Sequence, residues 1–332
     1  MPISKPGEPT MFDERLAKFA ETAPMPRLFP IIGQLRKPLS VAVVGRPGVG
    51  HDTVALALRS HGVDVAGGGA ADVQVLVIVE AIKPEERATA ADGLPTLIVL
   101  NKADLIGSRS GGALPNAHRR AADVQRRTGI PTVAMVGLLA ASTALEDELV
   151  DALRTLVHTP ADLASVDAFS SDGHAVSPDV RTRLLERLDR FGIAHAVLAL
   201  ADGTEPTALP GHLRSLSGVD AVLAGLEAVA APVRYRRRLA AMAEMHSLAV
   251  QLDDERLLRL LNSDAAVLAT MAAAVDVVEA DGIRVDPGDQ PDAHLRCAVQ
   301  WRRYGRGPVD ALHRSCSAAI TRGSLRLLDG CS

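Results

Sequence analysis

Aromatic side chains are nearly missing from this chain: they make up 2% of its 332 residues, although 47% of the residues are hydrophobic. The core must therefore be built from Ala, Val and Leu, packed densely as small side chains. Cysteine is scarce too, and the three present (Cys297, Cys316 and Cys331) lack CxxC spacing. They indicate isolated thiols in a reducing compartment and argue against a disulfide framework.

Long hydrophobic runs and a targeting signal are also missing. No apolar run approaches the ~18–20 residues that a membrane helix needs. The chain starts with a polar, proline-rich stretch, unlike the basic-then-apolar start of a signal peptide. We therefore expect a soluble cytoplasmic protein with no transmembrane segment.

Neither charge nor histidine spacing points to nucleic acid, metal or a catalytic triad. The formal net charge of −4 gives no electrostatic reason to expect a nucleic-acid partner. The ten histidines are scattered without metal-ligand spacing, and no Ser-His-Asp or Cys-His arrangement has a motif around it. We expect no metal site and assign no catalytic residue. A basic cluster, residues 234–238, is interpreted as a solvated helix face, with an acidic partner, lipid headgroups or an interdomain groove as alternatives.

The first half of the chain alternates short apolar runs with helical segments. Five of these runs have the character of strands, at residues 40–44, 63–65, 73–79, 96–100 and 132–136. Continuous apolar strands separated by helices are typical of a parallel sheet that is covered on both faces. We therefore expect an α/β fold with a mostly parallel five-stranded sheet.

The rest of the chain has a different character. Residues 178–330 show long amphipathic segments without strand signals, which predicts an all-α helical domain. We place the α/β domain at residues 31–158 and an N-terminal tail and helix at residues 1–30.

A glycine-rich loop follows the first strand and opens a helix. Gly45 and Gly50 have the spacing of the phosphate-binding pattern G-x-x-x-x-G-K-[ST]. The pattern's lysine is replaced by His51 and its hydroxyl by Asp52, with Thr53 one place late. Charge-assisted hydrogen bonds contribute about 1.5–3 kcal/mol each, so phosphate and Mg²⁺ should bind weakly or not at all. The alternative is an ordinary glycine turn between a strand and a helix.

A second motif follows the strand at residues 96–100. Asn101-Lys102-Ala103-Asp104 has the form of an Asn-Lys-x-Asp guanine-selecting tetrad. In such a tetrad the Asp carboxylate accepts from the N1 and the exocyclic amine of guanine. The Asn amide contacts the purine edge, and the Lys stem covers the ring. The alternative is a local Asx-turn that needs no nucleotide.

The segment between these motifs is too short for a complete GTP-hydrolysing site. Only residues 60–71 separate the first helix from the strand at Val73, which leaves no room for a first switch and its strand. Asp64 to Gly67 fits the loose Asp-x-x-Gly pattern, and the glycine run 67–69 is interpreted as a shortened turn. Mg²⁺ and a γ-phosphate therefore lack their usual holders.

With the loop Gly45–Gly50, the strand 73–79 and the tetrad Asn101–Asp104, the first half resembles the translation-factor class of P-loop GTPases. Residues 184–193, 213–220 and 233–239 are similar to the helical segment that follows the GTPase domain in actinobacterial dynamin-like proteins. The resemblance spans about residues 40–240. It implies a GTPase-like sheet, binding of GTP or GDP, and association with a GTPase paralogue or a second copy of the chain. His51, Asp52, the missing switch and the lack of an apolar tip loop depart from the family.

From these features we expect a non-catalytic GTPase relative that acts as a binding or regulatory subunit. GTP or GDP binds weakly or not at all, Mg²⁺ is not expected, and peripheral membrane contact stays open. The alternatives are a slow GTP hydrolase with an unconventional loop and a nucleotide-independent helical scaffold. The candidate nucleotide-binding residues are Gly45, Gly48, Gly50, His51, Asp52, Thr53, Asn101, Lys102 and Asp104.

Overall fold

The computed structural model describes residues 10–22, 25–67, 70–91, 93–107, 111–142, 144–171, 173–285, 288 and 290–330. The chain forms two compact units. The first, here called the sheet unit, is Leu39–Leu226; the second, the helical unit, combines Met1–Pro38 with Glu227–Ser332. This division differs from the sequence-based boundaries of 1–30, 31–158 and 178–330. Residues 178–226 are helical but belong with the sheet, because composition reports secondary structure rather than packing.

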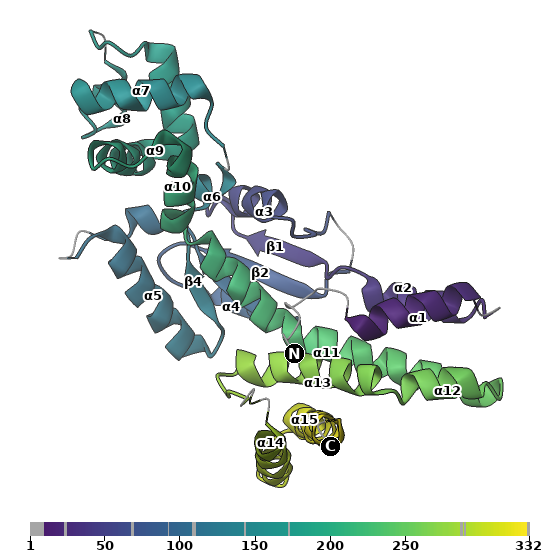
Figure 1. Cartoon of the computed structure of the whole chain (residues 1–332). Coiled ribbons are helices and arrows are strands. Elements are labelled where there is room, and N and C mark those ends of the chain that lie inside the picture. The colour runs from purple at the N-terminus through teal and green to yellow at the C-terminus, as the bar shows by residue number, and fades with distance from the viewer. Residues whose placement is uncertain are drawn as a thin grey trace. The chain divides into compact units, whose positions relative to one another are not determined.

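The sheet has four parallel strands in the order β1-β2-β3-β4. They are β1 (Val41–Gly45), β2 (Val73–Ile78), β3 (Thr96–Leu100) and β4 (Thr132–Ala134). Figure 1 shows β1 and β2 side by side, with helices around the sheet. All residues of β2 and β3 are buried, which explains their continuous apolar sequences. The α/β class is confirmed.

The prediction of a fifth strand at residues 63–65 is wrong. Val65 makes only an isolated parallel bridge to Val41. The amide of Val41 donates to the carbonyl of Asp64 at 2.8 Å, and the amide of Ala66 donates to the carbonyl of Val41 at 2.9 Å. The amide of Val63 still donates to Leu58 at the end of the preceding helix, so the segment is too short to extend the ladder.

Helices lie against both faces of this sheet. On one face, Leu76, Ile78, Ile98 and Leu100 share a core with α5 (Ala113–Thr128). On the other face α11 (Val219–Gln251) comes so close that a Cβ on Gly225 would lie 3.0 Å from the Leu97 side chain. Alternate residues of a strand point to opposite faces, so these two contacts lie on different sides.

Most other helices of the sheet unit connect strands or extend its core beyond β4. Leu139, Leu153, Phe169, Leu184 and Leu188 belong to the same hydrophobic cluster as the sheet. The helices are α3 (His51–Ser60), α4 (Pro84–Ala90), η1 (Ala103–Leu105), α6 (Gly137–Ala141), α7 (Asp147–His158), α8 (Val166–Ser170), α9 (Pro178–Ala201), η2 (Pro206–Ala208) and α10 (Leu209–Ser217).

Every element described in the helical unit is a helix. Its elements are α1 (Met11–Thr22), α2 (Leu28–Arg36), the later part of α11, α12 (Glu255–Leu261), α13 (Asp264–Ala280), α14 (Pro291–Tyr304) and α15 (Ala311–Asp329). Phe12 and Leu16 of α1 share a core with Met245 of α11, while Trp301 and Tyr235 lie in a second cluster.

In the basic cluster on α11 only Arg236 is exposed, and the other three arginines are engaged by neighbouring groups. Arg238 forms an ion pair of 3.1 Å with the buried Asp13, and Arg237 donates to the carbonyl of Lys37 at 2.6 Å. Arg234 pairs with Glu227 at 2.7 Å. Arg238 holds α1 against α11, because the Asp13 carboxylate can be buried only with a cation beside it, and Arg237 holds the end of α2 there.

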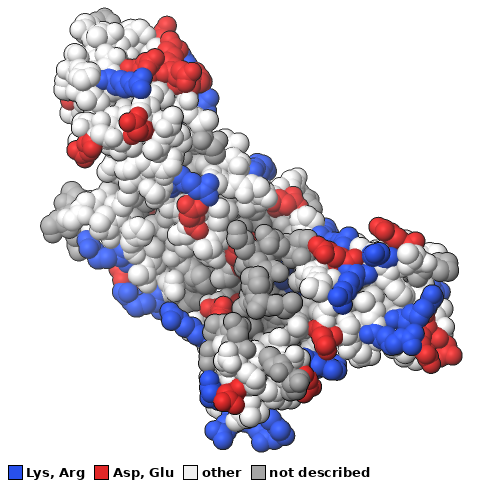
Figure 2. Space-filling model, in the orientation of Figure 1, with Lys and Arg blue, Asp and Glu red and all other residues white. Residues whose placement is uncertain are grey.

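In the part of the chain that the structure describes, no single helix is long and apolar enough to cross a membrane. Two bent pairs, Pro206–Ser217 with Val219–Gln251 and Glu255–Leu261 with Asp264–Ala280, reach that length and composition only together. On the face shown in Figure 2, Lys and Arg side chains are interspersed with Asp and Glu.

Candidate nucleotide site

The loop between β1 and α3 has backbone conformations that require glycine. Gly48 and Gly50 have φ angles of 85° and 82°, in the left-handed region. A Cβ on Gly45 would lie 2.8 Å from the carbonyl oxygen of Val77, so this glycine permits the loop to start flush against β2. Among the described residues no side chain caps the N-terminus of α3, which leaves its first amides open to an anion.

Asn101 joins this loop to two others. It is buried, its Nδ2 donates to the carbonyl of Val49 at 2.9 Å, and its Oδ1 accepts from the amide of Gly137 at 2.9 Å. These partners are 52 and 36 residues away in sequence, so the interaction is not a local Asx-turn. Because both ends of the amide bind backbone, Asn101 positions the loops and does not itself offer a free edge to a purine.

Lys102 makes a second link to the same loop. Its Nζ donates to the carbonyl of Gly48 at 2.8 Å, and its own backbone has a φ of 57°. A Cβ on Gly50 would come within 4.0 Å of Lys102 Cε, so the lysine stem lies across this glycine. The tetrad and the glycine loop are therefore one assembly, held by two hydrogen bonds that arrive at consecutive carbonyl groups.

Asp104 differs from its neighbours because its carboxylate has no side-chain hydrogen-bond partner among the described residues. Burial raises the pKa of this carboxyl, and the nearby Asp189 carboxylate raises it further. Its own backbone amide and the Lys102 ammonium lower the pKa without cancelling these effects. The ionised form is thus short of donors, which is the condition in which a ligand carrying N–H groups binds well.

His51 and Asp52 stand where the phosphate-binding pattern has a lysine and a hydroxyl. His51 Nε2 lies 3.4 Å from Asp52 Oδ1, and the Asp52 side chain is 94% exposed. Thr53 follows in the first turn of α3. The remaining cation in the loop, Arg46, donates from Nε to Glu86 Oε1 at 2.6 Å, and Glu86 is buried. Arg46 is therefore held against α4 and its charge is balanced there.

Sequence reasoning did not single out Asp189, whose charge raises the pKa of Asp104 and whose Oδ1 accepts from the amide of Arg190 at 2.6 Å. It lies in the middle of α9, where the helix breaks with φ 53° and ψ 176°. The helical pattern on both sides concealed the break. Gly192, three residues later, was a signal of irregular packing, since a Cβ there would lie 2.6 Å from the Leu139 side chain of α6.

The glycine loop and the tetrad follow the carboxyl ends of β1 and β3. After β1 the chain first forms the bridge of Val65 to Val41, on one side of β1. It then forms β2, which pairs with the other side of β1. In parallel sheets, ligands bind at such a reversal, outside the carboxyl ends of the strands. The glycine loop after β1 occupies this position.

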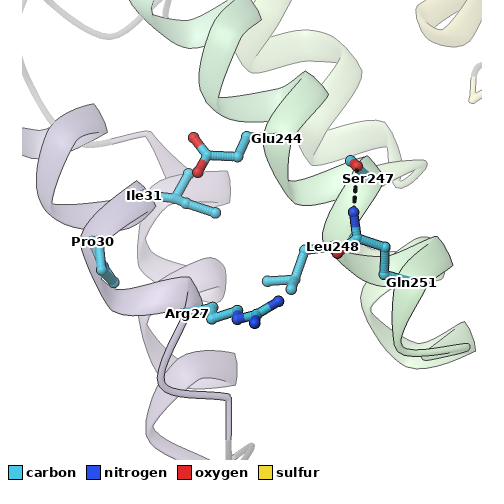
Figure 3. Close-up of a pocket in the computed structure, with 7 residues that line it drawn as sticks. All are labelled: Arg27, Pro30, Ile31, Glu244, Ser247, Leu248 and Gln251. Atoms are coloured by element: carbon cyan, nitrogen blue, oxygen red, sulfur yellow. Dashed lines mark hydrogen bonds between the residues drawn. The ribbon is translucent and has the colours of Figure 1, made fainter.

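A groove in the helical unit is a weaker candidate (Figure 3). It has a volume of about 350 Å³, and Ile31 and Leu248 are its buried residues. Its polar groups are exposed, and Ser247 and Gln251 already bond to each other at 3.2 Å. Within the described ranges no group of three or more His, Cys, Asp or Glu side chains is arranged to hold a metal ion. The lining residues are Arg27, Pro30, Ile31, Glu244, Ser247, Leu248 and Gln251.

The fold and the site define an α/β protein with a parallel sheet and a glycine loop joined to the loop after β3. No family model, no curated protein and no solved structure matches the chain.

Proposed function

We propose that the sheet unit is a guanine-nucleotide-binding module without GTP hydrolysis, and that the chain acts as a binding or regulatory subunit. One observation carries this proposal: Asn101 and Lys102 fasten the glycine loop, while the Asp104 carboxylate of the same tetrad accepts from no side chain in the described part of the chain and interacts only with its own backbone amide. A tetrad kept only for structure would need its first two residues alone. Asp104, an acceptor for two N–H donors, meets no other residue's hydrogen-bond donor within the described ranges.

The chemistry of the base explains why guanine fits this carboxylate. Guanine presents N1–H and an exocyclic amine on one edge, and a carboxylate accepts from both. Adenine presents a bare N1 acceptor there, which an ionised Asp104 would repel. We therefore expect GDP to bind and ADP to be rejected.

Hydrolysis is not expected because the phosphate end lacks the groups that stabilise the transition state. His51 does not supply a fixed positive charge, and Asp52 places an anion where a hydroxyl would ligate Mg²⁺. The backbone amides of the loop and of α3 remain as phosphate donors. Affinity should consequently depend on the base more than on the γ-phosphate, so that GDP and GTP bind similarly and Mg²⁺ changes little.

Calorimetric titration with two nucleotides that differ in their base, GDP and xanthosine diphosphate, tests the proposal. Wild-type protein should bind GDP, whereas Asp104→Asn should lose GDP affinity by about ten- to a hundredfold, the value of one charge-assisted contact. Xanthine carries an oxygen in place of the amine, and an asparagine amide matches it by donating N–H. The same variant should therefore gain affinity for xanthosine diphosphate.

Asp123→Asn is a matched control, because Asp123 is an exposed residue of α5 that pairs with Arg126. It should leave both affinities unchanged. If the wild-type protein binds no guanine nucleotide, or if Asp104→Asn and Asp123→Asn behave alike, the proposed function is wrong. Release of phosphate from GTP that is lost in Asp104→Asn would instead establish the slow hydrolase.

The proposed partner is an intact GTPase of the same class or a second copy of this chain. Sedimentation of the purified protein, alone and with GDP, tests self-association. A single species of monomer mass under both conditions would leave the paralogue as the partner to be tested.

A further inference from the structure

The helix α14 of the helical unit has an exposed side on which arginines surround two apolar side chains. The exposed residues recur at spacings of three and four, and residues with such spacings lie on one side of a helix. The other side packs into the helical unit, with Cys297 and Trp301 buried. We call the exposed side the basic face; its members are Leu295, Arg296, Val299, Arg302 and Arg303, followed by Arg306 just beyond the helix.

The charge of the basic face is not balanced locally. Its four arginines form no ion pair within the ranges that the structure describes, and the one acid on the same side of the helix is Asp292, in the first turn. Residues 291–330, which include α14 and α15, have seven arginines and three aspartates, a net charge of +4 in a chain whose net charge is −4. A surplus of one sign on a surface favours a partner surface of the opposite sign.

The composition of the basic face favours a protein partner over nucleic acid or lipid. Surfaces that bind single-stranded nucleic acid or lie at a membrane commonly expose aromatic side chains, which stack on bases or anchor at headgroups. Here Trp301 is buried, and the Tyr304 hydroxyl bonds with His313 Nδ1 at 2.5 Å. Leu295 and Val299 are 47% and 42% exposed among the arginines. An apolar centre with a polar rim is typical of a protein interface.

The same chain carries a complementary acidic face on α7 of the sheet unit. Glu146 precedes this helix, and Asp147, Glu148 and Asp151 lie in its first two turns; all four are exposed. Residues 146–190 have ten acids and five arginines, a net charge of −5. Figure 2 shows several Asp and Glu side chains together in the part of the sheet unit that contains α7. We call these four acids the acidic face.

The ion pairs that the acidic face makes within the chain leave it available to a partner. Arg183 pairs with Glu146 and Glu148, and Arg154 pairs with Asp151. Every side chain in these pairs is at least 37% exposed. Exposed pairs of this kind contribute little to stability, so their acids can exchange one cation for another. Asp147 forms no ion pair in the described part of the chain.

We propose that the basic face of one copy of the chain docks on the acidic face of a second copy. The two faces differ in sequence and belong to different units, so the contact is heterologous. Each copy then retains one face of each kind for a further copy, which builds chains or rings. The inference does not depend on the nucleotide site; it names the surfaces through which a second copy is the partner.

Sedimentation velocity of the full chain over a series of concentrations tests the inference. In about 50 mM NaCl the sedimentation coefficient of the wild type should rise with concentration, and in about 300 mM NaCl it should approach that of a monomer, because salt screens exposed charges. The basic-face variant, Arg302→Gln with Arg303→Gln, should associate about tenfold more weakly. The acidic-face variant, Asp147→Asn with Asp151→Asn, should show the same loss. All four side chains are exposed, so the fold should be retained.

A mixture of the two double variants distinguishes this heterologous contact from other modes of association. The basic-face variant retains an acidic face, and the acidic-face variant retains a basic face. At a concentration where each alone is monomeric, an equimolar mixture should therefore form dimers. Longer species should not form, because the remaining two faces have lost their charge.

Arg120→Gln with Arg127→Gln is the matched control, because it neutralises two exposed arginines on one side of α5 and changes the net charge equally. It should associate as the wild type does. The inference is wrong if the wild type stays monomeric at low salt, if the mixture does not dimerise, or if the control loses association as the basic-face variant does. Titration with GDP decides the nucleotide site separately, so either proposal can fail without the other.

Discussion

Replacing Asn101 with alanine should weaken the sheet unit far more than an ordinary polar truncation. The change removes two buried hydrogen bonds of 2.9 Å, one to the carbonyl of Val49 and one from the amide of Gly137. Each bond contributes about 1 kcal/mol net, and each backbone group left buried without a partner costs about 1–3 kcal/mol. Water that reaches the unpaired groups of Val49 and Gly137 in the variant reduces the cost of leaving them without a partner. We expect the free energy of unfolding of the sheet unit to fall by about 2–5 kcal/mol.

Hydrogen exchange followed by mass spectrometry is the suitable assay, because it resolves the two units of the chain separately. Peptides that cover residues 41–60 and 132–141 should lose protection in Asn101→Ala, while peptides from α14 and α15 should keep theirs. Asn262→Ala is a matched control, since this exposed amide makes one bond, to Leu258, at the end of α12. A loss below about 1 kcal/mol in Asn101→Ala would refute the reasoning that this residue holds three loops together.

Two further predictions concern buried charges in each unit. In the helical unit, the pKa of Asp13 is lowered, because Arg238 and Thr10 outweigh the burial that alone would raise it; Asp13→Asn should therefore cost about 3–5 kcal/mol near neutral pH. A carboxyl whose pKa is lowered by folding stabilises the protein above the unfolded-state pKa of 3.8, so the difference in unfolding free energy between wild type and Asp13→Asn should shrink as pH falls below 3.8. Urea unfolding followed by the fluorescence of the buried Trp301 measures this difference. A difference that does not change with pH would contradict the assignment. In the sheet unit, Arg181 is 1% exposed, donates to the carbonyl of Phe169, and has an Nε with no partner in the described part of the chain. Arg181→Met should raise the unfolding free energy by about 1 kcal/mol in the same exchange assay, and a loss of several kcal/mol would show that the cation is needed.

Two features of the sheet unit, the raised pKa of Asp104 and the strained backbone of Asp189, lower the stability of the folded protein. The raised pKa of Asp104 means that its ionised form weakens the native state as pH rises toward neutrality. The backbone of Asp189 adds strain of its own. Binding sites commonly carry such unfavourable groups, because the ligand supplies the partners that the fold withholds.

Local patterns in the sequence were sufficient to find the strands that carry the site. Residues 73–79 and 96–100 correspond to β2 and β3, and the glycines at 45, 48 and 50 occur in the strand–loop–helix context that their spacing indicated. The segment at residues 63–65 was misassigned because two valines satisfied the strand pattern. Whether such a short segment extends a ladder depends on where the neighbouring helix ends, and that is not a property of the pattern.

The sequence by itself determined the elements and the residue types available at the loop after β3, because strand burial, glycine conformation and helix formation depend on neighbouring residues. Only the tertiary structure decided what those residues do. It assigned Asn101 to the backbone of two distant loops and paired Asp13 with Arg238 across 225 residues of chain. Such contacts depend on how the elements pack, and no local spacing records which side chains will meet when they do.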